Sequence, residues 1–196
     1  MRFKPNKTVI LVVILVISGS LLPSCTKYLS KKPDSSVAVP TTLNDLQSLL
    51  DYSSRMNLQT TSNFGEASAD DYFLPEEAYN ELDVYGKKIY TWTPADYSYP
   101  NDWSGAYEPI YTSNYCLDQI QKIQKTEMNA VEWNNVYGSS LFYRSYYFLD
   151  LLWAFAKAYD SSTFETDLGI VLRTGSDFSV PSVRSNVKDC YMQVLT

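Results

Sequence analysis

The pattern of apolar and polar residues predicts four helices, of which the first and the last are short. The first should begin near Thr42, because Thr42 and Asp45 have the spacing of a capping box, and should fade around residues 52–56. One face of it carries leucines at helical spacing: Leu43, Leu46, Leu49 and Leu50. The last helix should begin at Asn186, with Asp189 three residues further on.

Two longer stretches with helical periodicity predict the main body of the domain. The first covers about 102–125, where Pro109 either kinks the helix or marks the first turn of a new one. The second covers about 130–159 and has few polar residues after Leu141, so it should be buried on most sides. Arg144 is a charge within this apolar stretch and should either extend to solvent or find a polar partner.

The segment between the first and second helices has no sustained periodicity. Residues 57–100 are rich in Asn, Ser, Asp, Pro and aromatic residues. A short helical turn should follow Pro75, because the two glutamates after it suit a helix N-terminus. Residues 88–93 and 167–173 have the pattern of short extended segments. The sequence therefore predicts a mainly α fold with long, aromatic-rich loops.

Residues 1–24 have the layout of a secretory signal: a basic start followed by a short apolar stretch at 8–22. The motif Leu22-Pro23-Ser24-Cys25 resembles a bacterial lipobox, which would make Cys25 the acylated N-terminus of the mature protein. The alternative is an ordinary signal peptide followed by an unmodified cysteine. We therefore divide the chain into a signal peptide (1–24), an extended tether (25–40) and a helical domain (41–196).

The charge of the mature chain excludes several classes of function. Removal of residues 1–24 takes away three of the 16 basic residues and none of the 22 acidic ones, so the net charge falls from −6 to −9. An acidic chain of this kind is a poor partner for nucleic acid, whose phosphates require Lys and Arg. The absence of histidine excludes His-based triads and the common zinc sites.

Cys116 and Cys190 remain once Cys25 is acylated. Both occupy apolar positions of helical stretches, which favours two buried thiols, although an exported protein could also pair them.

Four motifs occur in order along the mature chain: "YLSKKP" just after Cys25, "WSGAYEPIYTSNYCLDQI" (103–120), "YRSYYFLDLLWAFAKAYD" (143–160), and "DLGIVLR" followed by "PSVRSNVKDCYMQVL". Together they resemble the SusD/RagB family of outer-membrane lipoproteins from Gram-negative bacteria. The chain departs from the family pattern at Ser145, Val171 and Asn186, where the family usually has Ala, Pro and Thr.

This resemblance implies a fold of tetratricopeptide-like helix pairs, anchored in the outer membrane and facing the cell surface. It also implies a partner, a SusC-like TonB-dependent transporter, over which the lipoprotein captures its ligand. The usual ligands are oligosaccharides, and some relatives serve peptides instead. Family members are far longer and the last helical pattern is interrupted at Thr196, so we expect this chain to be the N-terminal part of a longer protein.

The aromatic-rich segment supplies candidate ligand contacts. Flat aromatic rings suit the apolar C–H face of a sugar, and Asp or Asn oxygens suit its hydroxyl rim. The loop "WTPADYSYPNDW" (92–103) contains both kinds of group. Our candidate binding residues are Asp71, Trp92, Tyr97, Tyr99 and Trp103. The alternative for each aromatic residue is a place in the core, most of all for Trp103, near the start of the predicted helix at 102–125.

The acidic pairs Asp70-Asp71 and Glu76-Glu77 raise the alternative of a surface glycoside hydrolase. Glycosidases need two carboxylates about 5–10 Å apart on opposite sides of the bond. Adjacent carboxylates in a polar loop rarely meet this geometry, so we expect a non-catalytic protein without a cofactor or metal. A calcium site at these acids is a minor alternative. The other function that we keep open is a lipid-anchored helical-repeat protein that binds peptides or only its transporter.

Overall fold

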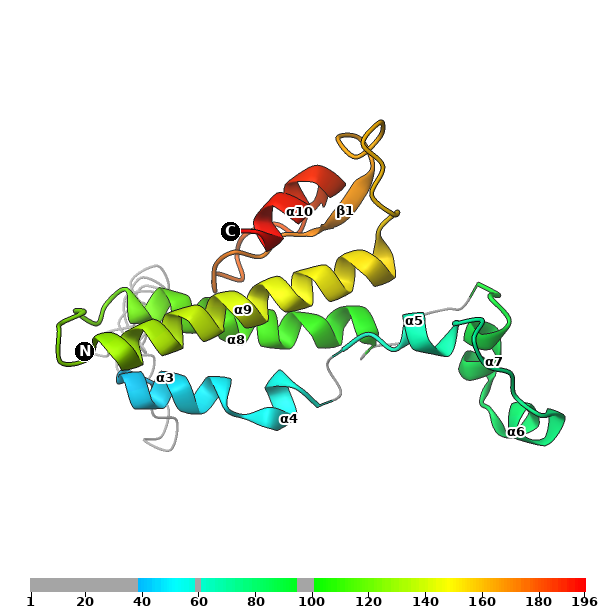
Figure 1. Ribbon diagram of the computed structural model, residues 1–196, viewed down its shortest axis with the longest axis horizontal. Coiled ribbons are helices and arrows are strands. Elements are labelled where there is room, and N and C mark those ends of the chain that lie inside the picture. Colours follow the sequence, from blue (N-terminus) through cyan, green and yellow to red (C-terminus); the bar gives the residue numbers. More distant parts are fainter. Residues whose placement is uncertain (1–38, 59–60, 95–100) are drawn as a thin grey trace, which may run out of the picture. The chain divides into compact units, whose positions relative to one another are not determined.

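The computed structural model describes residues 39–58, 61–94 and 101–196. The predicted signal peptide, Cys25 and residues 26–38 of the predicted tether lie outside these ranges. Within the described ranges, no helix is both long and apolar enough to cross a membrane. Figure 1 shows that these ranges are mainly helical, as the hydrophobic pattern predicts.

Two long helices lie side by side and form the scaffold: α8 (Asp102–Ile120) and α9 (Ala130–Phe155) (Figure 1). With β1 and α10, they bury one apolar cluster: Ala106, Ile110, Tyr147, Phe148, Leu151, Leu152, Ile170 and Cys190. Helix α8 ends about five residues earlier than the periodicity predicts, and α9 about four residues earlier. Helix α8 continues through Pro109, which is buried, so this proline does not begin a new helix.

The first predicted helix is confirmed as α3 (Leu43–Leu50), and α4 (Ser53–Met56) follows it. The predicted capping box is present: the backbone N–H of Asp45 donates to Thr42 Oγ1 at 3.1 Å, and Asp45 Oδ2 accepts from the backbone N–H of Thr42 at 3.1 Å. The leucine face packs against both long helices in a second apolar cluster: Leu46, Leu50, Met56, Cys116, Ile120 and Val136.

The C-terminal part contains β1 (Leu168–Val171), β2 (Arg184–Asn186) and α10 (Val187–Val194). The strands pair antiparallel, with Leu168 opposite Asn186 and an irregularity before Val171. The side chain of Asn186 caps α10 by accepting from the backbone N–H of Asp189 at 2.7 Å, as predicted. Gly169 is required here, because a Cβ atom would come within 2.5 Å of Cys190 Sγ.

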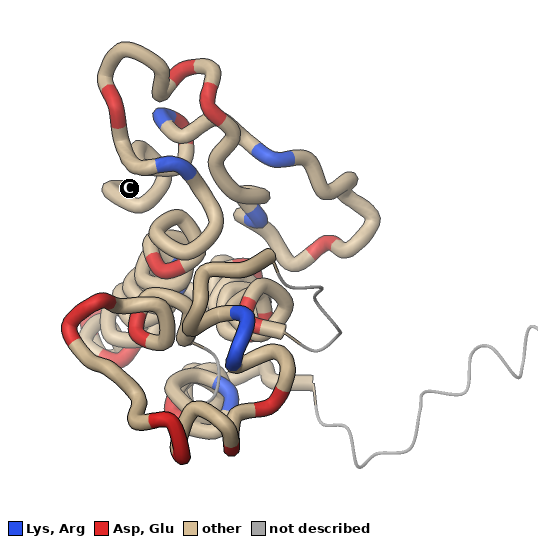
Figure 2. The backbone as a smooth tube through the Cα atoms, turned by 90° about the vertical axis from the view of Figure 1, so that its right-hand side faces the viewer, with Lys and Arg blue, Asp and Glu red and all other residues tan. Residues whose placement is uncertain are grey.

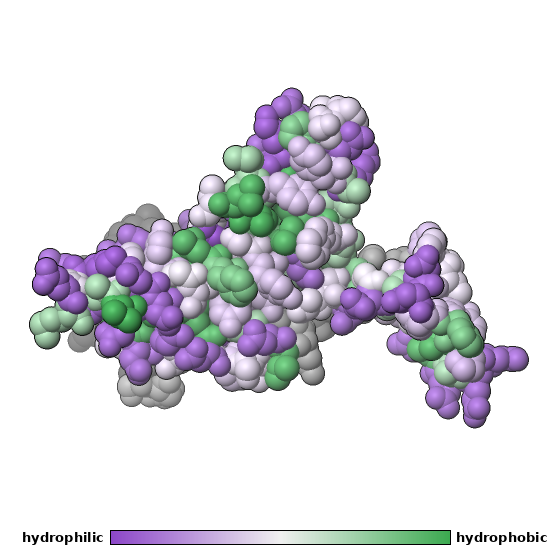
Figure 3. All heavy atoms as spheres, in the orientation of Figure 1, coloured by the Kyte–Doolittle hydropathy of each residue, from purple (hydrophilic) through white to green (hydrophobic). Residues whose placement is uncertain are grey.

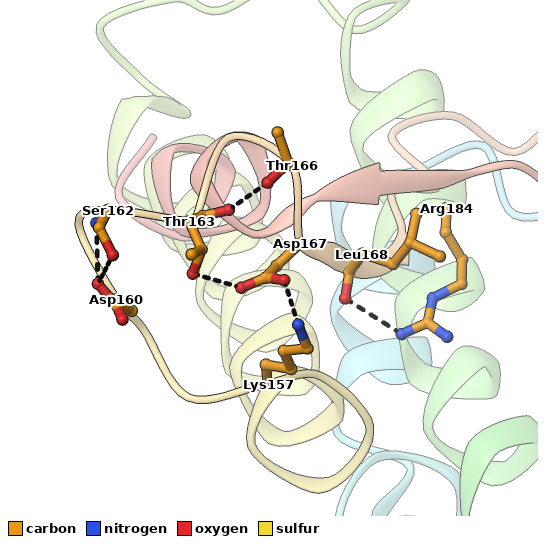
Figure 4. Close-up of polar contacts among 8 residues, drawn as sticks. All are labelled: Lys157, Asp160, Ser162, Thr163, Thr166, Asp167, Leu168 and Arg184. Atoms are coloured by element: carbon orange, nitrogen blue, oxygen red, sulfur yellow. Dashed lines mark hydrogen bonds and ion pairs between the residues drawn. The ribbon is translucent and has the colours of Figure 1, made fainter.

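The connection from α9 to β1 is held by side-chain hydrogen bonds (Figure 4). Asp167 lies between two donors: Lys157 Nζ is 2.5 Å from one carboxylate oxygen, and Thr163 Oγ1 is 2.6 Å from the other. These two hydrogen bonds lower the pKa of Asp167. Asp160 accepts from the backbone N–H and the hydroxyl of Ser162. Figure 4 also shows Arg184 directed at the carbonyl of Leu168, at 3.3 Å.

Arg144 finds polar partners rather than extending freely to solvent. Its Nη1 atom donates to Asn114 Oδ1 at 3.2 Å and to the carbonyl of Thr174 at 3.5 Å. Burial lowers the pKa of this guanidinium. Cys116 and Cys190 are both free and buried, which confirms the interpretation as two thiols.

Between α4 and α8, three short helices replace the predicted long loop: α5 (Phe64–Ala67), α6 (Glu76–Glu81) and α7 (Val84–Tyr90). The helical turn predicted after Pro75 is confirmed as α6. The extended segment predicted at 88–93 is wrong, because its first three residues complete α7. The local cause is Asp83, whose side chain caps α7 by accepting from the backbone N–H of Gly86 at 2.6 Å.

Candidate functional site

The C-terminus of α7 places Trp92 in an unusual backbone conformation. Trp92 has φ 55°, in the left-handed region. Its backbone N–H donates to the carbonyl of Ile89 at 3.1 Å, and the N–H of Thr93 donates to the carbonyl of Lys88 at 2.8 Å. These two bonds form a Schellman motif, in which the position of Trp92 is normally glycine. A side chain at this position costs about 1–2 kcal/mol, because its Cβ approaches the following carbonyl oxygen.

The Trp92 side chain is held at the surface and not in the core. Its indole N–H donates to the carbonyl of Ser68 at 2.8 Å, while 72% of the residue remains exposed. Residues held in a strained backbone conformation cluster at active sites and ligand-binding positions, which makes Trp92 a candidate for such a position.

Trp92 forms one side of an open groove of about 420 Å³. The groove is lined by Phe64, Ser68, Lys88, Ile89, Trp92, Thr93, Pro94 and Ala154. It therefore lies between α5, the end of α7 and the end of α9. Phe64 also joins the groove to the scaffold, since its ring meets the ring of Phe155 edge-on at 5.4 Å.

Two carboxylates attach the start of α5 to the long helices. Asp150 Oδ2, on α9, accepts from the backbone N–H of Ser62 at 3.0 Å, and Asp102 Oδ2, on α8, accepts from that of Asn63 at 2.8 Å. Burial, and to a lesser degree the charge of Asp102, raise the pKa of Asp150. This attachment keeps Phe64 in place beneath the groove.

The tyrosines of this region are mainly structural. The ring of Tyr90 lies 5.9 Å from that of Tyr72 and 5.8 Å from that of Tyr79. Tyr72 donates its hydroxyl proton to the carbonyl of Ala67, and Tyr90 Oη accepts from the backbone N–H of Leu74. These contacts connect the ends of α5, α6 and α7. Phe73, at 80% exposure, is the most exposed aromatic ring among the residues described.

The structure brings the sequence-predicted residues together only in part. Trp92 lines the groove, whereas Asp71 lies on an exposed bend and is not among the lining residues. Trp103 is half-buried, packs edge-on against Phe155 at 5.2 Å, and lines a different cavity. Tyr97 and Tyr99 lie outside the described residues.

Sequence reasoning missed Phe64, Ser68 and Ile89. Phe64 begins a single helical turn with no periodicity to reveal it. Ser68 contributes through a backbone carbonyl, which leaves no signal in the sequence. The acids of the enzyme alternative, Asp70-Asp71 and Glu76-Glu77, are all exposed, and the glutamates form the first turn of α6.

Comparison with known protein families identifies the chain. Residues 27–196 match the model of a family described as starch-binding and associating with the outer membrane. The chain belongs to this SusD-like family. The match covers most of the chain and confirms the resemblance carried by the four sequence motifs. No curated protein matched the sequence.

Two solved structures share the SusD-like fold. A SusD superfamily protein from Bacteroides thetaiotaomicron is 21% identical, with a TM-score of 0.61 over 79% of this chain. A protein from Bacteroides vulgatus, named as a candidate sugar-binding protein, is 20% identical, with a TM-score of 0.64 over 81% of this chain. The matched regions span only 35% and 36% of those two chains, so this chain corresponds to about a third of their length.

Proposed function

We propose that this protein is a non-catalytic lipoprotein of the outer membrane that captures oligosaccharides at the Trp92 groove. It would pass them to a SusC-like TonB-dependent transporter. The family's description as starch-binding and associating with the outer membrane supports the ligand class and the location. In this proposal, acylation at Cys25 rests on the lipobox, and the transporter partner rests on the family resemblance.

The geometry of Trp92 is the observation that carries the ligand proposal. A pyranose ring offers an apolar face of C–H groups, and an exposed indole offers a flat surface of matching size. Thr93 and Lys88 line the same groove and could bond to the hydroxyls at the ring's edge. Because the groove is open, it suits a chain of sugar rings better than an enclosed small molecule.

The surroundings of the groove also fit a neutral ligand. Residues 61–94 contain seven acidic residues and two lysines, and Figure 2 shows Asp and Glu along the side of the molecule on which α5, α6 and α7 lie, so an anionic ligand would be repelled here. Binding of an uncharged oligosaccharide would then depend little on salt, unlike binding of a polyanion.

A second candidate function is supported by the exposed face of α9. Phe142, Tyr146 and Trp153 lie at helical spacing and are 65%, 45% and 71% exposed. Figure 3 shows hydrophobic residues reaching the surface over α9 and α10. Such a face suits packing against another polypeptide, as expected for a helical-repeat protein that binds peptides or only its transporter.

The test compares two tryptophans with the same exposure. The full chain should be retarded in a native gel containing starch, and Trp92→Ala should weaken this retention about tenfold, because it removes the stacking surface. Trp153→Ala is the matched control, since Trp153 is 71% exposed but does not line the groove. Equal retention of both variants and the wild type would contradict the Trp92 site. Binding of peptides without any binding of polysaccharide would favour the second function.

Acylation is tested separately by metabolic labelling with a palmitate analogue. The wild-type chain should incorporate the label, and Cys25→Ser should not. Labelling of the Cys25→Ser chain at the wild-type level would contradict a lipid anchor at this residue.

A further inference from the structure

A second cavity, of about 270 Å³, lies between α8 and the segment 171–182, which begins with the last residue of β1. It shares no lining residue with the Trp92 groove. Its aromatic wall consists of Trp103, Tyr107 and Tyr111, which follow one another at intervals of four residues on α8. Phe178 completes this wall from the opposite segment, with its ring stacked on that of Tyr111 at 4.6 Å.

Side chains of α8 fix the segment that forms the opposite wall. Asn114 Nδ2 donates to the carbonyl of Arg173 at 2.6 Å. Asp118 accepts from the backbone N–H of Ser176 at 2.9 Å and from its hydroxyl at 2.5 Å. The hydroxyl of Tyr107 donates to the carbonyl of Val171 at 2.9 Å. A wall held by this many bonds is pre-organised, so a ligand would lose little binding energy in ordering it.

Two charged side chains of opposite sign lie at the cavity. Arg173 donates to the carbonyl of Val180 at 2.6 Å and to Ser182 Oγ at 2.5 Å. A guanidinium has five N–H donors, so these two bonds orient it and leave others for a ligand. Asp177 Oδ1 accepts from the backbone N–H of Ser179 at 2.8 Å, which orients the carboxylate in the same way.

These features select for a neutral ligand with hydroxyl groups. A charged ligand would be attracted by one of Arg173 and Asp177 and repelled by the other. A polyol can accept from the guanidinium and donate to the carboxylate at the same time. A flat aromatic ligand cannot enter between Tyr111 and Phe178, because these rings are already stacked on each other.

We propose that this cavity is a second carbohydrate site, separate from the Trp92 groove, which binds one pyranose ring against the aromatic wall. Its volume of about 270 Å³ is below the range of about 300–1,000 Å³ that is typical of pockets for drug-sized ligands. It therefore holds a single ring or the end of a chain. For one ring, a Kd of about 1 mM is expected.

Hydrogen–deuterium exchange of the purified full chain separates the two sites. With methyl α-D-glucopyranoside at about ten times that Kd, exchange in residues 172–183 should slow. Phe178→Ala should weaken the affinity about fivefold to tenfold and so reduce this protection, because it removes one aromatic contact from a residue that is 76% exposed and not part of the core. Asp177→Asn is a second variant, which removes the acceptor charge and keeps the size.

The outcomes distinguish this site from the proposed function. Protection of 172–183 that Phe178→Ala weakens and Trp92→Ala leaves unchanged would support the second site. If maltoheptaose protects 84–94 but no sugar protects 172–183, the second site is wrong and the Trp92 proposal stands. If only 172–183 is protected, the Trp92 proposal is wrong and the second site stands. If a tyrosine-containing peptide protects 172–183 and sugars do not, the cavity is a peptide site and this proposal is overturned.

Discussion

The backbone of Trp92 predicts that two substitutions which remove the same indole will differ in stability. Trp92→Gly and Trp92→Ala both lose the hydrogen bond to Ser68 and the aromatic surface of the groove. They differ by one Cβ atom at a residue with φ 55°. If the Schellman motif imposes this conformation, glycine should be the better residue.

The size of the difference follows from two opposing effects. The Cβ of alanine costs about 1–2 kcal/mol in the left-handed region. Glycine lowers the stability by about 0.4–1 kcal/mol relative to alanine, because it gives the unfolded chain more conformational freedom. The middles of these two ranges differ by about 0.8 kcal/mol, so we expect the motif to be less stable by this amount in Trp92→Ala than in Trp92→Gly, which corresponds to a difference of about fourfold in local opening.

The assay must report on α7 and not on the whole domain. Helices α5, α6 and α7 contain no fully buried residue, so this part can open without unfolding the α8–α9 core. Amide exchange at residues 92 and 93, measured by NMR, reads the two hydrogen bonds directly. Exchange should be faster in Trp92→Ala than in Trp92→Gly, while both variants lose binding of polysaccharide equally. Equal or slower exchange in the alanine variant would refute the argument from strain.

Three further predictions concern the scaffold. Gly169→Ala should lower the free energy of unfolding by about 1–3 kcal/mol, because its Cβ would clash with Cys190 Sγ. The control is Gly138→Ala, which has open space within α9 and should raise the free energy of unfolding by about 0.5–1 kcal/mol. Thermal unfolding measures both variants, and equal melting temperatures would contradict the clash. Burial raises the pKa of Asp150, so ionisation of its carboxylate opposes folding. Asp150→Asn should therefore be more stable than the wild type at pH 7, and this advantage should vanish below about pH 3.9, the usual pKa of an aspartate in an unfolded chain. Chemical denaturation at both pH values measures the difference. Burial raises the pKa of Cys116 to about 12 and also raises that of Cys190, so in the Cys25→Ser chain neither thiol should react with a thiol reagent at pH 8 until the protein unfolds. Rapid reaction of this chain in its native state would show that the two thiols are accessible.

Helices with local capping chemistry could be predicted from the sequence. Thr42 and Asp45 at the start of α3, and Asn186 and Asp189 at the start of α10, form their bonds within one turn and need no distant partner. The sequence indicated that Arg144 needs a polar partner. It could not indicate that this partner is Asn114, which lies on another helix 30 residues away.

The binding region was predictable in composition but not in geometry. Its aromatic content marked the segment, yet Phe64 and Ala154 reach the groove only because α5 and the end of α9 come together in three dimensions. The sequence offered two alternative roles for Trp103, a place in the core or a ligand contact, and could not decide between them. In the structure Trp103 both packs against the core and lines a cavity.

The wrongly predicted extended segment at 88–93 and the candidate site share residues. Residues 88–93 are rich in the β-branched and aromatic residues that are typical of strands, and a tryptophan after a helix gives no indication of a C-cap, where glycine is expected. Local rules and the native structure normally agree, and the exceptions concentrate where function requires them. A glycine would end α7 with less strain, but it could not present an indole over the groove. The mismatch between Trp92 and its backbone is therefore itself an argument for a binding role.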